Sequence, residues 1–162
     1  MILTLRPAGI SPESRIHIGP RSGYAARVMQ PTEGTGRRTT PVVLVVDDDE
    51  YVHAALAAAL RSLKPEVIRA TTAEEGLGMA IERVPDIAII DLGLPDTDGY
   101  SLTRRIRAIA ELRDTRILIL TGHLPDQDAA RDAGADAILA KPFRLNEFLA
   151  TIETLRSLPA GT

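Results

Sequence analysis

Cysteine is absent from the 162-residue chain, and its absence excludes disulfides, thiolate nucleophiles and cysteine-ligated zinc sites. Aromatic residues make up only 3% of the chain, so the hydrophobic core has to be built from Ala, Val, Leu and Ile. No apolar run approaches the roughly 20 residues that a membrane-spanning helix needs. We therefore expect a cytoplasmic protein with an aliphatic core and no membrane partner.

Charge is distributed unevenly along the chain. The first 40 residues contain six arginines and two glutamates, a net charge of +4, whereas the whole chain carries −3. The remainder therefore carries −7, and no nucleic-acid partner is expected, because phosphate contacts require a basic surface. Four prolines interrupt any helix in residues 1–40, which we interpret as a disordered or irregular extension. A transit peptide and a true start at Met29 are alternatives.

The pattern changes at Pro41, after which short apolar runs alternate with segments of helical spacing. The runs are continuous, which is typical of parallel strands buried on both faces. Between them, apolar residues such as Val52, Leu56 and Leu63 fall on a single helical stripe. Five repeats of strand and helix predict an α/β fold, a doubly wound five-stranded parallel sheet with helices on both faces. The expected strands are 42–46, 66–70, 86–90, 116–120 and 137–140.

Polar residues mark the expected helix ends. Asp49 and Asp98 each stand where a helix begins, and a carboxylate there can accept hydrogen bonds from free backbone N–H groups. Thr72 and Glu75 have the spacing of a capping box at the start of the second helix. The fourth helix should end at Gly134. The fifth should bury a stripe formed by Leu145, Phe148, Leu149, Ile152 and Leu155.

Charged and polar residues follow four of the five strands. In this fold class ligands bind at the carboxyl ends of the strands, so we expect these side chains to form a site. Clustered carboxylates without His or Cys offer the hard oxygen ligands that suit Mg²⁺. A carboxylate beside Mg²⁺ and a lysine ammonium can attack a phosphoryl group. Asp91 is the expected nucleophile because it is a single carboxylate at the end of the central strand. The residues are Asp47, Asp48, Asp49, Asp91, Thr121 and Lys141.

Four motifs, in this order, resemble those of response-regulator receiver domains, the CheY-like domains of two-component signalling. They are "VLVVDDDE", "IAIIDLGLPDTDG", "ILILTG" and "LAKPF", and the similarity covers about residues 42–158. The resemblance implies a flavodoxin-like sheet with strand order 2-1-3-4-5. We expect a receiver domain at 41–158, preceded by the extension at 1–40 and followed by a tail at 159–162.

The same resemblance implies which residues bind Mg²⁺ and which one accepts the phosphoryl group. Asp47 and Asp48 would be the acidic pair, with Asp48 a direct ligand of Mg²⁺. Asp91 would be the phospho-accepting aspartate and a further metal ligand. The backbone carbonyl of Gly93 would also bind the metal. Asp49, by contrast, is interpreted as a helix cap.

Thr121 and Lys141 would contact the phosphoryl group, and the Lys141–Pro142 peptide bond would be cis. Ile138 departs from the family pattern, because many receivers carry Tyr or Phe three residues before the lysine, with a rotamer coupled to the threonine. An aliphatic side chain cannot make that movement, so how phosphorylation is transmitted is left open. His123 is interpreted as a solvated loop residue, with control of water access to the acyl phosphate as the alternative.

These features predict a single-domain response regulator, since residues 159–162 leave no room for an output domain. It would accept a phosphoryl group from a sensor histidine kinase or a histidine phosphotransfer protein, and signal to a downstream protein or through a phosphorelay. It would not be an enzyme beyond self-directed phosphotransfer and autodephosphorylation. One alternative is an aspartyl-phosphate hydrolase, disfavoured because Tyr51 stands where that motif has Thr or Val. The other is a pseudo-receiver, disfavoured by the intact Asp91, Thr121 and Lys141.

Overall fold

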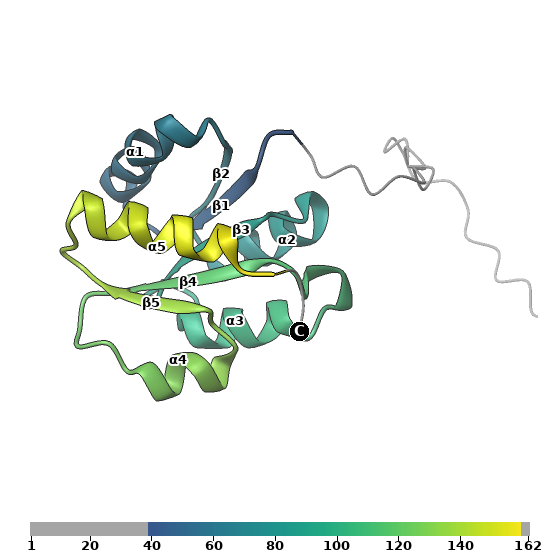
Figure 1. The fold of residues 1–162 in the computed structure, drawn as a ribbon. Coiled ribbons are helices and arrows are strands. Elements are labelled where there is room, and N and C mark those ends of the chain that lie inside the picture. Colours follow the sequence, from purple (N-terminus) through teal and green to yellow (C-terminus); the bar gives the residue numbers. More distant parts are fainter. Residues whose placement is uncertain (1–38, 160–162) are drawn as a thin grey trace, which may run out of the picture. The chain divides into compact units, whose positions relative to one another are not determined.

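Five strands form one parallel sheet in the computed structural model, which describes residues 39–159. Their order across the sheet is β2-β1-β3-β4-β5, which confirms the predicted topology and makes β3 the central strand (Figure 1). The strands are β1 (Val42–Val46), β2 (Glu66–Ala70), β3 (Ile87–Asp91), β4 (Arg116–Thr121) and β5 (Ala137–Ala140).

Helices cover the two faces of the sheet (Figure 1). The buried side chains of α1 and α5 join one hydrophobic cluster, and those of α2, α3 and α4 join a second cluster on the other face. Two short 3-10 helices follow α1 and α3. The bounds are α1 (Glu50–Ala59), η1 (Leu60–Leu63), α2 (Ala73–Arg83), α3 (Gly99–Arg107), η2 (Ala110–Leu112), α4 (Gln127–Ala133) and α5 (Leu145–Ser157).

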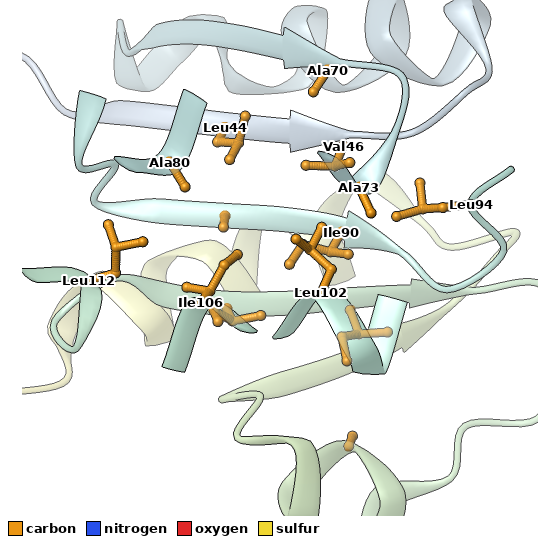
Figure 2. Packing of buried hydrophobic residues seen from close by; sticks show 14 residues of the cluster. Leu44, Val46, Ala70, Ala73, Ala80, Ile90, Leu94, Leu102, Ile106 and Leu112 are labelled. Carbon is orange, nitrogen blue, oxygen red and sulfur yellow. The ribbon is translucent and has the colours of Figure 1, made fainter. Parts of the chain in front are cut away.

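Alternate residues of β1 belong to the two helical layers. Leu44 and Val46 pack in the cluster of α2 and α3, whereas Val43 and Val45 pack in the cluster of α1 and α5. Figure 2 shows the first of these clusters, in which Leu44 and Val46 lie on the same face of the sheet as the α3 residues Leu102 and Ile106. Every residue of β1 and β3 is buried, as the continuous apolar runs predict.

The prediction of burial on both faces is wrong for β2. Glu66 and Arg69 are exposed, and only Ala70 is buried. The reason is topological, because β2 is an edge strand that pairs with β1 alone in the sheet. Glu66 instead forms a salt bridge with Arg83 of α2, so polar side chains occupy this edge, as is common at exposed sheet edges.

The predicted N-terminal caps are confirmed. Asp49 caps α1 and Asp98 caps α3 through side-chain hydrogen bonds from backbone N–H groups. Thr72 caps α2 by accepting from the backbone N–H of Glu75 at 3.1 Å. The capping box itself is incomplete, because the Glu75 carboxylate accepts from the backbone of Thr71, at 2.8 Å, rather than from Thr72.

The predictions for the last two helices, a C-cap at Gly134 and a buried stripe on α5, are confirmed in part. Gly134 ends α4 with a φ of 91°, as predicted for a left-handed C-cap. Phe148, Ile152 and Leu155 of α5 are buried. Leu145 is 59% exposed, contrary to the prediction, since the buried part of α5 begins one turn inside the helix.

Parts of the predicted domain plan lie outside the described residues. The extension at 1–40 is described only at residues 39 and 40, and the tail at 159–162 only at residue 159. Between residues 39 and 159, no helix has both the length and the apolar character needed to cross a membrane.

Candidate functional site

Three carboxylates from two neighbouring strand ends form a cluster. Asp47 and Asp48 follow β1, and Asp91 is the last residue of β3. The two strands are adjacent in the sheet, with Val46 and Ile90 as partners in the register. One carboxylate oxygen from each aspartate lies within 4.8 Å of the others. The sheet therefore gathers three of the residues that the sequence singled out.

Asp47 and Asp48 have different surroundings although they are adjacent in sequence. Asp47 is 1% exposed, and both of its carboxylate oxygens are engaged, Oδ1 by the backbone N–H of Asp49 at 2.9 Å and Oδ2 by Lys141 at 3.2 Å. Asp48 is exposed, and no donor within residues 39–159 reaches its carboxylate. Asp48 is thus the member of the pair whose oxygens are free to bind an ion.

Lys141 contacts the carboxylate cluster from the end of the edge strand β5. It follows β5, and its Nζ lies 2.7 Å from Asp91 Oδ1 and 3.2 Å from Asp47 Oδ2. The Lys141–Pro142 peptide bond is cis, as predicted. Partial burial disfavours the charged ammonium, but the hydrogen bond to Asp91 and the charge of Asp47 outweigh this effect, so the pKa of Lys141 is raised above its usual value. The ammonium therefore offsets part of the negative charge of the cluster.

The carboxylate of Asp91 is held from two sides. Oδ1 accepts from Lys141, and Oδ2 accepts from the backbone N–H of Gly93 at 2.9 Å. Asp91 is 7% exposed, so its carboxylate is nearly enclosed but retains an opening to solvent. Gly93 lies at the site, as the sequence led us to expect, and contributes its N–H to the carboxylate.

Thr121 stands at the end of the next strand, beside Asp91. It is the last residue of β4, and β3 and β4 are paired so that Asp91 faces Leu120. Thr121 is 1% exposed, and its Oγ1 accepts a hydrogen bond from the backbone N–H of His123 at 3.1 Å. The hydroxyl hydrogen is not used in that bond and can be donated to a ligand. His123 itself is exposed, in agreement with its interpretation as a solvated loop residue.

Asp49 is not part of the carboxylate cluster. Its Oδ1 accepts from the backbone N–H of Tyr51 at 2.8 Å, which satisfies a free N–H group at the start of α1. The structure therefore supports its interpretation as a cap and separates it from the residues that face the site.

Residues 43–153 match the family model of the response regulator receiver domain. The chain belongs to this family. The described residues accordingly form the receiver domain of a two-component response regulator, and the order of strands agrees with the CheY-like fold.

The receiver is similar to curated regulators of bacteria. It is 38% identical over 117 residues to the transcriptional regulatory protein PrrA of Mycobacterium tuberculosis, covering 72% of this chain and 50% of PrrA. It is 38% identical over 123 residues to the transcriptional regulatory protein PhoP of Escherichia coli, covering 74% of this chain and 53% of PhoP. The chain spans about half the length of these regulators. Both are named as transcriptional regulators, which weakens the expectation that the protein has no nucleic-acid partner.

Solved receivers share the fold. A response regulator from Chloroflexus aurantiacus is 36% identical with a TM-score of 0.69, and the match covers 74% of this chain and 99% of that one. The chemotaxis response regulator CheY4 of Vibrio cholerae is 27% identical with a TM-score of 0.68, covering 72% and 99%.

The acidic cluster of the receiver has the composition of a Mg²⁺ site. Receiver domains bind Mg²⁺ at such a cluster, and here the three side chains, Asp47, Asp48 and Asp91, present only oxygen atoms. Hard oxygen donors suit Mg²⁺, and the exposed carboxylate of Asp48 has no competing hydrogen bond within residues 39–159. The donor set of this chain therefore fits the metal of its family.

Two residues that support the receiver's site were not predicted. A Cβ at Gly99 would lie 2.5 Å from the backbone oxygen of Asp91, so only glycine lets α3 begin against the end of β3. Asp96 accepts from the backbone N–H groups of Ala73 at 2.9 Å and Glu74 at 3.1 Å, and so caps α2 from the loop after β3. The "DTDG" motif signals a turn, but the pairing of Asp96 with α2 depends on the tertiary fold.

The two phenylalanines of the receiver pack in the hydrophobic cluster on the opposite face of the sheet from Ile138. Ile138 is partly buried and packs against the cluster of α2 and α3. Phe143 stacks on Phe148 of α5, with ring centroids 5.4 Å apart and an interplanar angle of 22°. Phe143 thus anchors the loop that follows Lys141 to the other hydrophobic cluster.

Proposed function

We propose that this receiver accepts a phosphoryl group on Asp91 from the phosphohistidine of a sensor histidine kinase or a histidine phosphotransfer protein. The observation that supports this most strongly is the position of the Asp91 carboxylate. It lies 2.7 Å from the Lys141 ammonium, next to the free carboxylate of Asp48, at a strand end that neighbours Thr121. This arrangement surrounds one nucleophile with groups that can stabilise phosphoryl oxygens.

The acidic residues would hold the metal that the family uses. Asp48 and Asp91 would bind Mg²⁺ directly, the carbonyl of Gly93 would be a further ligand, and Asp47 would act from its buried position beside them. Mg²⁺ bound there supplies positive charge that offsets the repulsion between the carboxylates and the incoming phosphoryl oxygens.

The transfer itself would proceed at Asp91. A carboxylate oxygen attacks phosphorus, an O–P bond forms, and the P–N bond to the donor imidazole breaks as its electron pair returns to nitrogen, which takes up a proton. Lys141 neutralises part of the charge on the transferred oxygens, and the free hydroxyl hydrogen of Thr121 is donated to one of them. Hydrolysis of the acyl phosphate reverses the modification, so the activity is directed at the protein itself.

Phosphorylation would act as a switch between conformations. A partner that binds the phosphorylated conformation better shifts the equilibrium toward it, and by linkage favours phosphorylation to the same extent. We propose that the output passes to another protein in the cytoplasm, by direct contact or through a phosphorelay. With Ile138 in place of an aromatic residue, the conformational signal has to use a different side chain.

The test uses a small phosphodonor, phosphoramidate, with intact-mass detection. Wild type should gain the mass of one phosphoryl group in the presence of Mg²⁺ and none without it. Asp91→Asn should gain none, whereas Asp132→Asn, an exposed acid of α4 outside the cluster, should be labelled like wild type. An unlabelled wild type, under conditions that label a known receiver, would show that the domain is a binding module without phosphotransfer.

A further inference from the structure

His53 of α1 is a buried histidine whose ring contacts the backbone of the acidic pair, Asp47 and Asp48. It is 3% exposed, and its Nε2 lies 2.7 Å from the backbone carbonyl oxygen of Asp47. A carbonyl oxygen can only accept, so the ring must donate from a protonated Nε2. No second donor within residues 39–159 reaches this carbonyl.

The other ring nitrogen shows that packing alone does not account for a histidine here. Nδ1 is buried and has no hydrogen-bond partner among the described residues. A buried polar atom without a partner is unfavourable, and a leucine of similar size would fill the same space without one. What His53 adds over an apolar residue is therefore the Nε2–H donor to Asp47.

This donor acts on the peptide unit that joins the two aspartates. The peptide group is planar, so holding the carbonyl of Asp47 also fixes the orientation of the N–H and the Cα position of Asp48. Asp47 is further held by its N–H, which donates to Ala70 at 3.1 Å, and by Lys141 on its carboxylate. The carboxylate of Asp48 has no hydrogen bond of its own within residues 39–159, so its direction depends on this backbone.

We propose that His53 is a positioning residue, which orients the Asp47–Asp48 peptide through its Nε2–H and thereby sets the Mg²⁺ affinity of the receiver. This inference rests on the proposed function. His53 touches neither the phosphoryl group nor the metal. It acts through the backbone, in the manner of the outer-shell groups that orient metal ligands.

The test compares substitutions that keep or remove the donor. His53→Leu fills the space without a donor, and His53→Gln places an amide N–H near the position of Nε2. Leu60→Val serves as the control, since Leu60 is fully buried in the hydrophobic cluster of α1 and α5, and shortening its side chain perturbs packing without removing a hydrogen bond. Mg²⁺ affinity is measured by calorimetric titration, folding by urea denaturation without Mg²⁺, and phosphorylation by intact mass at several Mg²⁺ concentrations.

We expect His53→Leu to fold and to raise the Mg²⁺ dissociation constant about tenfold, the low end for loss of an outer-shell partner. Its labelling should be restored at high Mg²⁺. His53→Gln and Leu60→Val should stay within about twofold of wild type in Mg²⁺ affinity. If His53→Leu does not fold, His53→Met, which is flexible and lacks the donor, takes its place.

Two results would overturn the proposal. One is an unchanged Mg²⁺ affinity in the folded variant without the donor, and the other is a folded His53→Gln that binds Mg²⁺ as weakly as that variant. These results are distinct from failure of the proposed function, in which wild type itself is not labelled at any Mg²⁺ concentration.

Discussion

The ammonium of Lys141 lies 2.7 Å from the carboxylate of Asp91, although β4 separates the strands that carry these two residues in the sheet. The same ammonium lies 3.2 Å from Asp47. One cation therefore spans the ends of three strands and sits beside the atom that we propose as the nucleophile. Removal of the Lys141 ammonium should weaken phosphotransfer without weakening metal binding.

Substitution of Lys141 by methionine should slow the labelling of the receiver by phosphoramidate about 100-fold, a typical effect of removing a group that stabilises transition-state charge. Mg²⁺ affinity should be unchanged or higher, because the ammonium no longer competes with the ion for the carboxylates. Lys64→Met removes the other lysine of the chain, which precedes β2 and so lies at the edge of the parallel sheet opposite the site, and should label like wild type. Equal labelling rates for Lys141→Met and Lys64→Met would contradict this role.

Asp48 and Asp49 should behave differently when each is replaced by a neutral residue. Asp48→Asn removes the free carboxylate of the cluster, so calorimetry should show a large loss of Mg²⁺ affinity. Asp49→Ala removes the cap of α1 and should lower the free energy of unfolding by about 1 kcal/mol, with Mg²⁺ binding retained. A loss of Mg²⁺ binding in the Asp49 variant would show that the third acid of the run is a ligand after all.

The two glycines inside α2 should respond in opposite directions to alanine. A Cβ at Gly76 would lie 2.7 Å from Val46 Cγ2 in the core, so Gly76→Ala should lower the free energy of unfolding by about 1 to 2 kcal/mol despite the gain in helix propensity. A Cβ at Gly78 would meet nothing within 4 Å, and Gly78→Ala should raise stability by about 1 kcal/mol. Urea denaturation followed by circular dichroism measures both, and changes of the same sign would refute the packing argument.

Acid should remove the contribution of Asp98 to stability. The hydroxyl of Ser101 donates to its carboxylate at 2.7 Å and, against a smaller effect of burial, lowers the pKa of Asp98 below its usual 3.8. A lowered pKa in the folded state stabilises the protein above the unfolded-state pKa, and the effect is lost as the pH falls through the folded-state pKa. The difference in unfolding free energy between wild type and Asp98→Asn should therefore be constant above about pH 5 and shrink below about pH 4. A difference that does not change with pH would contradict this assignment.

Local sequence signals predicted the sheet and most of the site because each depends on near neighbours. Continuous apolar runs mark buried strands, and the residue after each run falls at the same edge of a parallel sheet. The order of strands and polar residues along the chain therefore places Asp47, Asp91 and Lys141 at one edge of the sheet, and the resemblance to receiver domains implied the order of the strands across it. The caps at Asp49 and Asp98 follow the same logic, because the donor and acceptor are within three residues.

The features that the sequence did not reveal depend on contacts between distant segments. Asp96 caps a helix that begins 23 residues earlier, and the need for glycine at Gly76 comes from the approach of Val46. The partial exposure of β2 follows from its place at the sheet edge, which the sequence of residues 66–70 does not specify. In the sequence, nothing distinguishes His53 from other helix residues. Its contact with the carbonyl of Asp47 is seen only in the fold.

The most direct test of phosphorylation at Asp91 identifies the residue that carries the phosphoryl group. Wild type labelled in the presence of Mg²⁺ is treated with borohydride, which reduces an aspartyl phosphate to homoserine, and its peptides are then sequenced by mass spectrometry. Homoserine is expected at position 91 and at no other aspartate. Homoserine at Asp47 or Asp48, or a labelled protein with aspartate intact at position 91, would contradict it.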